Sequence, residues 1–180
     1  MVSLGSSHGV RRARADEWEA LREIRLAALA DSPDAFGSML AEERDADEAR
    51  WRGWITGEGW AGDVAMFIAD GPDRFLGMAT GFQPDDRPTI GWLFAMWVRP
   101  ERRGAGIGRR LVAAVAEWAA SLDIDQLLLH VTEGNDGAVR FYASCGFVVT
   151  ADPPEPLREG SDLTSRTMRL LLGSQPSSSH

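Results

Sequence analysis

Apolar and polar positions alternate with two different periods along the chain, and the changes of period mark the expected elements. Near the N-terminus, apolar residues recur at helical spacing, at Trp18, Leu21, Ile24 and Leu29. Asp16, with Glu19 three residues later, is expected to cap this helix, and Pro33 ends it because the preceding residue avoids helical backbone angles. A short strand over 10–15 should precede this helix, and a second helix over 45–55 should follow it.

The middle of the chain changes to strand-like runs. Apolar segments at 64–69 and 75–82 flank a turn signal at 70–73, which predicts a hairpin. After a loop at 84–88, the run Ile90–Val98 is apolar on both faces. A strand that is apolar on both faces is typical of the centre of a sheet.

A glycine-rich turn at 102–108 opens the second half. The helix expected after it carries apolar residues at three- and four-residue steps, at Ile107, Leu111, Val112, Val115, Trp118 and Ala119. The remaining expected elements are a strand at 126–131, a helix at 135–144, a strand at 145–149, a proline-rich loop at 153–156 and a strand at 164–172. The polar ends, 1–9 and 173–180, are expected to be disordered, which leaves one domain over 10–172.

Composition excludes several classes of function. The net charge of −8 makes general nucleic-acid binding unfavourable, because like charges repel. Cys145 is the single cysteine, so no intramolecular disulfide can form, and no signal peptide or run of 18 apolar residues is found. We therefore expect a cytoplasmic protein without a membrane partner. His8, His130 and His180 lack metal-ligand spacing, so no metal is expected.

The glycine-rich turn has the properties of an anion site. Its glycines allow backbone N–H groups to approach a ligand, and the start of the following helix carries free N–H groups at the positive end of the helix dipole. Four arginines add positive charge there, at Arg102, Arg103, Arg109 and Arg110. A P-loop would need Lys and a hydroxyl after Gly108, and a dinucleotide turn would need another glycine spacing. Two interpretations of the turn remain. It is either an acetyl-coenzyme A (acetyl-CoA) loop, for which Arg103, Gly106 and Gly108 match the pattern, or a turn that binds nothing.

Two segments resemble the GNAT superfamily of acetyl-CoA-dependent N-acetyltransferases. The first is LFAMWVRPERRGAGIGRRLVAAVAEW at 93–118, and the second is NDGAVRFYASCGF at 135–147, which is similar to the family element N-x-x-A-x-x-x-Y-x-x-x-G-F. The resemblance implies an α/β (α+β) fold with a mixed, mostly antiparallel central sheet, a splayed parallel strand pair and flanking helices. The parallel strands would be those at 90–98 and 126–131, with the pantetheine arm of the cofactor between them.

The same resemblance implies the cofactor contacts. The pantetheine would pair with the backbone of Met96, Trp97 and Val98, and the diphosphate would lie on the amides of 103–108. The implied cofactor-binding residues are Met96, Trp97, Val98, Arg103, Gly104, Ala105, Gly106, Ile107, Gly108, Arg109, Asn135, Ala138 and Tyr142. We expect acetyl-CoA as co-substrate and an amine-bearing acceptor, either a small molecule or a protein amine.

Acetyl transfer to an amine by direct attack in a ternary complex requires an acid and a means of deprotonating the amine. Tyr142, the single tyrosine, matches the family position for the group that protonates the departing sulfur. The strand at 90–98 holds no acidic residue, so the base is open between Glu42 or Glu43, His130 and a water relay. Cys145 has no evident His–acid partner, so it is not expected to act as a nucleophile.

Other functions and details remain open from sequence. A non-catalytic acyl-CoA sensor or scaffold would keep the glycine loop, and a nucleotide-binding protein is a third interpretation. Four tryptophans could line an acceptor pocket, although core packing explains most of them, namely Trp51, Trp54, Trp60 and Trp92. The acceptor and any homodimer are not readable from the sequence.

Overall fold

The computed structural model describes residues 9–173, which build one mixed sheet with helices on both faces. The strands are β1 (Val10–Arg12), β2 (Gly62–Ala69), β3 (Gly77–Pro84), β4 (Ile90–Val98), β5 (Gln126–Thr132), β6 (Val148–Val149), β7 (Glu155–Pro156) and β8 (Thr164–Leu171). The helices are α1 (Trp18–Asp31), α2 (Leu40–Arg44), α3 (Glu48–Thr56), α4 (Ile107–Ser121) and α5 (Asp136–Ser144), with 3₁₀ turns η1 (Ala15–Glu17), η2 (Pro33–Ala35) and η3 (Pro100–Arg102).

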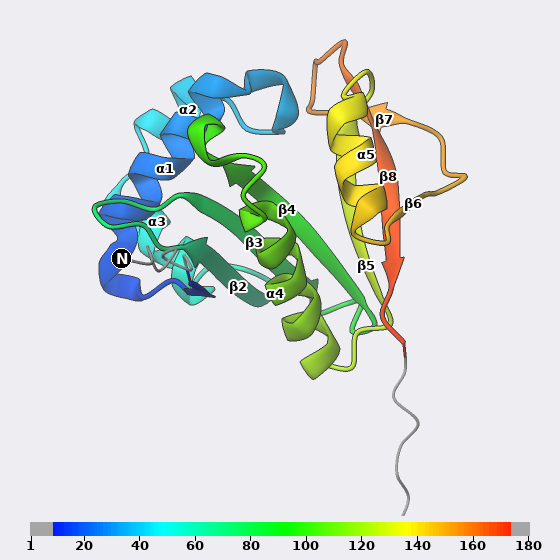
Figure 1. Ribbon diagram of the computed structural model, residues 1–180, viewed down its shortest axis with the longest axis horizontal. Helices are drawn as coiled ribbons and strands as arrows, with labels where there is room; N and C mark the ends of the chain where they lie inside the picture. Colours follow the sequence, from blue (N-terminus) through cyan, green and yellow to red (C-terminus); the bar gives the residue numbers. More distant parts are fainter. Residues whose placement is uncertain (1–8, 174–180) are drawn as a thin grey trace, which may run out of the picture.

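The sheet order is β1-β2-β3-β4-β5-β8-β6, and β7 pairs with β8. Every neighbouring pair is antiparallel except β4 and β5, which run parallel. In Figure 1, β4 and β5 meet at one end and diverge toward the other, with α4 beside β3 and β4 and α5 beside β5 and β8. This arrangement confirms the fold class that the resemblance implied, and it confirms the central place of β4.

Strand β2 explains how helices cover both faces, because its side chains alternate between two cores. Ala65, Phe67 and Ala69 join the core under α4, whereas Met66 and Ile68 join the core under α1 and α3. Each core is fully buried at its centre. The sheet is therefore fixed from both sides at its β2–β4 half, which makes it a rigid support for the ends of β4.

Several local predictions are corrected. Asp16 does not cap α1, because the chain enters through η1 and Glu17 takes the N-cap position. The Glu17 carboxylate accepts from the backbone N–H of Arg14 at 2.8 Å and from the Arg11 guanidinium at 2.6 Å. The bond from Arg11 ties the start of α1 to β1, and the bond from Arg14 closes the turn between them.

Other boundaries also move. The second helix begins at Glu48 rather than 45, because Asp47 accepts from the N–H of Arg50 and caps it. Strand β3 lies two residues later than predicted, and the proline-rich loop contains β7. The strand expected at 145–149 shortens to β6, because Gly146 adopts a positive φ of 97° after α5.

Two further points concern the chain ends and membrane-spanning helices. The disorder predicted for the chain ends falls on 1–8 and 174–180, outside the described residues, and it stays a prediction. Within 9–173, no helix is long and apolar enough to cross a membrane.

Candidate active site

A bulge in β4 separates it from β5. Thr80 pairs with Phe94 and Met78 pairs with Trp97, so β4 contains one residue more than β3 between these pairs. Ala95 adopts a φ of +51°, a left-handed backbone that an alanine rarely takes. Bulges bend the strand that carries them. The bulge lies just beyond Trp92, the last residue of β4 that pairs with β5, so it bends β4 where the two strands diverge.

The divergence of the two strands opens a cleft. Parallel pairing covers Ile90–Trp92 against Gln126–Leu128 and stops there. Beyond it lies a cavity of about 700 Å³ between β4, the 102–109 turn, β5 and α5. Of the predicted cofactor-binding residues, all but Ala105 line this cleft: Met96, Trp97, Val98, Arg103, Gly104, Gly106, Ile107, Gly108, Arg109, Asn135, Ala138 and Tyr142.

The glycine turn offers unused backbone donors to the cleft. Gly104 and Gly106 have φ values of 80° and 76°, which only glycine adopts without strain, and Gly106 is the N-cap of α4. Within the described residues, no hydrogen bond uses the amide N–H groups of residues 104–109. Free N–H groups at a helix start favour an anion.

Two of the turn's arginines are held by neighbouring elements. Arg103 donates from Nε to the Val98 carbonyl at 3.0 Å and from Nη2 to Asp31 at 2.7 Å. Arg109 donates to the Ser144 carbonyl at the end of α5 at 2.7 Å. These bonds connect the turn to α1 on one side and to α5 on the other, so they fix the width of the cleft at its entrance.

Asp31 joins three groups at the C-terminal end of α1. Its carboxylate accepts from the Ser32 hydroxyl, from Nε1 of Trp97 and from Arg103. These donors hold the pKa of Asp31 below its ordinary value. The ionised carboxylate therefore orients Trp97 and Arg103, two residues that line the cleft.

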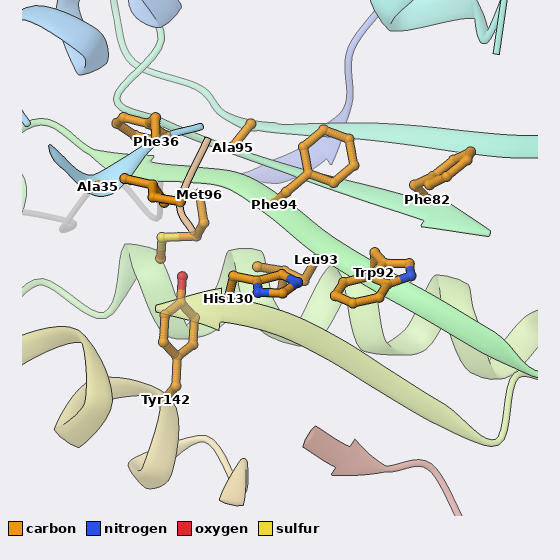
Figure 2. Close-up of a pocket in the computed structure, with 11 residues that line it drawn as sticks. Ala35, Phe36, Phe82, Trp92, Leu93, Phe94, Ala95, Met96, His130 and Tyr142 are labelled. Carbon is orange, nitrogen blue, oxygen red and sulfur yellow. The ribbon is translucent and has the colours of Figure 1, made fainter. Parts of the chain in front are cut away.

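Helix α5 brings Tyr142 to the inner end of the cleft. Asn135 caps the helix, since its side chain accepts from the N–H of Ala138 at 3.1 Å. Tyr142 is buried against Phe141 and Phe147 in edge-to-face contacts, and burial raises the pKa of its phenol well above the ordinary value. In Figure 2 its hydroxyl points out of α5 toward Met96 on β4. The phenol is therefore protonated at neutral pH and faces the gap.

A second cavity of about 400 Å³ adjoins the cleft. Its lining residues are Ala35, Phe36, Phe82, Trp92, Leu93, Phe94, Ala95, Met96, His130, Tyr142 and Leu157 (Figure 2). Five of them also line the cleft: Ala35, Phe36, Met96, His130 and Tyr142. Tyr142 and His130 therefore lie where a ligand in the cleft would contact a ligand in the second cavity.

His130 extends from β5 with its ring stacked on Trp92. The ring centroids lie 5.0 Å apart with the planes 3° from parallel, and Nδ1 lies 3.3 Å from the Ser165 hydroxyl. Partial burial lowers the pKa of His130 below its ordinary 6.5, although the charge of Glu155 opposes this shift. A neutral imidazole at this position can accept a proton.

The acidic candidates lie elsewhere. Glu43 is 2% exposed and accepts two bonds of 2.9 Å from the Arg25 guanidinium. Glu42 lines a separate surface hollow, and its carboxylate accepts from the N–H of Met39. Neither residue lines the cleft or the adjoining cavity. The Arg25–Glu43 pair instead supports Phe36, whose ring lies 4.7 Å from the Arg25 guanidinium carbon.

Sequence reasoning missed the bulge at Ala95, the Asp31 junction and the wall formed by Phe36. No local pattern marks them, because each depends on contacts between residues far apart in the chain. Of the four tryptophans, Trp92 lines the second cavity and Trp51, 1% exposed, belongs to the core. Among the described residues, no group of three or more His, Cys, Asp or Glu side chains could hold a metal ion.

Comparisons with known proteins agree with this geometry. The family model of the acetyltransferase (GNAT) family matches residues 18–147. Mycothiol acetyltransferase of Thermobispora bispora is 31% identical over 134 residues, which cover 72% of this chain and 42% of that protein. The chain therefore spans less than half the length of this relative. L-methionine sulfoximine/L-methionine sulfone acetyltransferase of Pseudomonas paraeruginosa is 26% identical over 73% of this chain and 83% of its own.

The solved structures extend the likeness to the whole fold. The structure of yncA from Salmonella typhimurium with its cofactor acetyl-CoA has a TM-score of 0.76 at 20% identity. The match covers 97% of this chain and 99% of that one.

Proposed function

Since the chain belongs to the acetyltransferase (GNAT) family, we propose that it uses acetyl-CoA and moves the acetyl group onto a primary amine. The observation that carries this proposal is the meeting of two cavities at Tyr142 and His130. The cleft has backbone N–H donors that have no partner among the described residues and suit a diphosphate, and the second cavity can receive an acceptor. Both substrates can then be present together.

The cleft has the chemistry that coenzyme A needs. The amides of 104–109 would hold the diphosphate with the positive end of the α4 dipole. Within residues 9–173, no strand pairs with the β5-facing edge of β4 beyond Trp92, so the backbone of Met96–Val98 can pair with the pantetheine amides. Bound acetyl-CoA supplies an activated thioester, and the remaining chemistry falls to the side chains around it.

Tyr142 is the group that we assign to the departing sulfur. In the reaction a C–N bond forms between acceptor and acetyl group while the C–S bond breaks, and the sulfur gains one proton. Burial keeps the phenol protonated, so the proton is available when negative charge develops on sulfur. We assign the stabilisation of charge on the carbonyl oxygen to a backbone N–H of β4 at the bulge, next to Met96 in the lining of the cleft.

His130 is the group that we assign to the amine proton. The Ser165 hydroxyl donates to the carbonyl of Glu155 at 3.4 Å, so its oxygen is free to accept from Nδ1–H of His130. That tautomer leaves the Nε2 lone pair as the proton acceptor. Glu43, fully engaged by Arg25, has no such freedom. Cys145 does not line either cavity, which favours direct attack by the amine over a covalent cysteine route.

A thiol-release assay tests the proposal. Purified protein with acetyl-CoA and a panel of primary amines should release free CoA thiol in step with an acetylated amine detected by mass spectrometry. Binding of CoA by calorimetry without thiol release on any amine would favour a non-catalytic acyl-CoA-binding module. Failure to bind CoA would contradict the proposal as a whole.

A further inference from the structure

The second cavity has an unusual lining, because aromatic rings form most of its wall. Phe82 comes from β3, Trp92 and Phe94 from β4, and Phe36 from the segment after η2. Among the residues that the structure describes, no Asp, Glu, Lys or Arg lines it, and the ionisable groups in its lining are His130 and Tyr142. A space of this kind binds apolar groups and offers few ionic contacts.

The rings of Phe82, Trp92 and Phe94 are partly exposed, whereas Phe36 is buried. Leu93, between Trp92 and Phe94, is 2% exposed in the core under α4, whereas the two aromatic neighbours point the opposite way. Trp60 supports the wall, with its ring stacked on Phe94 at 5.7 Å and tilted against Phe82 at 5.2 Å. The aromatic wall is therefore held in place by contacts within the protein itself.

Carboxylates near the cavity are either engaged or outside it. Asp31 is bound by Arg103 and Trp97, and Glu43 by Arg25. Glu155 acts on His130 through its charge but does not line the cavity. A second ammonium group of a polyamine would therefore enter without a counter-charge. Burial of a single amine here instead lowers its pKa, which favours the neutral form that attacks the thioester.

We propose that the acceptor is a primary amine attached to an aromatic or similarly flat apolar group, with that group held between Phe36, Phe82, Trp92 and Phe94. This inference rests on the proposed acetyl transfer and names its substrate class. A cavity of about 400 Å³ accommodates a group of one or two rings. Contact with the aromatic wall supplies the affinity, and the amine nitrogen points to the junction at His130 and Tyr142.

The first test compares amines on the wild-type protein. We measure kcat/KM for 2-phenylethylamine, 1,4-diaminobutane and glucosamine with acetyl-CoA, and CoA binding separately by calorimetry. We expect 2-phenylethylamine to exceed both others by at least about tenfold. Equal or better use of diaminobutane or glucosamine, or no use of 2-phenylethylamine by a protein that binds CoA, overturns the inference alone. Absence of CoA binding overturns the proposed function and the inference with it.

The second test places a carboxylate in the wall. Phe94→Glu should lower the ratio of kcat/KM for 2-phenylethylamine over diaminobutane by at least about tenfold, since it removes a ring and adds a counter-charge. Val148→Glu adds the same charge at a side chain 55% exposed on β6 and should leave the ratio unchanged. Phe94→Leu, a milder change, should lower use of 2-phenylethylamine while CoA affinity is retained. An unchanged ratio in a folded Phe94→Glu protein, or in Phe94→Leu, contradicts the inference.

Discussion

At the scale of single residues, two side chains with opposite pKa shifts share one junction. Burial raises the pKa of Tyr142 and lowers that of His130, so the phenol stays protonated and the imidazole stays neutral around pH 7. Paired groups whose environments drive their pKa values apart are typical of an acid and a base in one reaction. The physical cause is the same for both, because burial disfavours whichever form is charged.

Replacing Tyr142 by Phe isolates the proton on the phenol. The ring contacts with Phe141 and Phe147 persist, so the fold and the cleft should be retained. We expect kcat to fall on the order of 10²-fold, because general acid catalysis is lost. CoA affinity measured by calorimetry should change little. Full turnover of the Tyr142→Phe protein would remove Tyr142 from the mechanism.

The pH profile tests His130. Its pKa lies below 6.5, so the neutral base is already present near pH 7 and is lost as pH falls through that lowered value. The kcat/KM of the wild type should therefore show an acidic limb below pH 6.5, in addition to any limb set by the acceptor amine. His130→Gln should lower the rate and abolish the acidic limb. A profile of unchanged shape would assign the proton to water.

At the scale of elements, a buried ion pair holds the segment that carries Phe36, a residue in the lining of the second cavity. Arg25 on α1 and Glu43 on α2 are each at most 3% exposed, and the Arg25 guanidinium lies between the rings of Phe36 and Trp54. Nη1 of Arg25 finds no hydrogen-bond partner among the described residues. The pair therefore depends on its two remaining bonds to compensate for desolvation.

Glu43→Gln should destabilise the protein, because it leaves the Arg25 charge buried without an opposite charge. Loss of one partner of a buried pair costs about 3–5 kcal/mol, which lowers Tm on the order of 10 °C. Thermal unfolding followed by circular dichroism measures this shift. The double variant Arg25→Met/Glu43→Leu should recover most of the stability. If Glu43→Gln keeps its Tm and loses turnover, Glu43 has a catalytic role that its position here does not explain.

Helices, strands and turns were easier to predict from the sequence than the contacts between them. The bounds of β4 and the course of α4 follow from apolar periodicity, and the glycine turn follows from residues that need a positive φ. Tyr142 and the cleft-lining residues of β4, the glycine turn and α5 followed from two motifs, whereas Ser32, Ala35 and Phe36 did not. In contrast, the bulge at Ala95 and the aromatic wall depend on contacts between residues far apart in the chain, which one sequence does not record locally. The N-cap at Glu17 depends on the η1 turn, which the spacing of the apolar residues does not predict.

At the scale of the whole molecule, the sheet consists of two parts joined by a short parallel pairing. Helices α1, α3 and α4 cover β1–β4, while α5 packs beside β5 and β8 (Figure 1). Outside the three paired positions of β4 and β5, the cleft separates the parts. A ligand that fills the cleft would contact both sides and stabilise the folded state.

Thermal stabilisation should distinguish CoA from other nucleotides. At 100 times Kd, a ligand that binds only the folded state adds about 2.7 kcal/mol, which raises Tm by roughly 5–10 °C. We expect this shift with CoA and a smaller one with ATP, which lacks the pantetheine arm. An equal or larger shift with ATP would favour a nucleotide-binding function instead.

The most direct measurement is a crystal structure of the protein with acetyl-CoA. We expect the diphosphate within hydrogen-bond distance of the amides of 104–109, the pantetheine along β4 at Met96–Val98, and the thioester sulfur beside the Tyr142 hydroxyl. Electron density that places the cofactor outside the gap between β4 and β5, or its sulfur away from Tyr142, would contradict it.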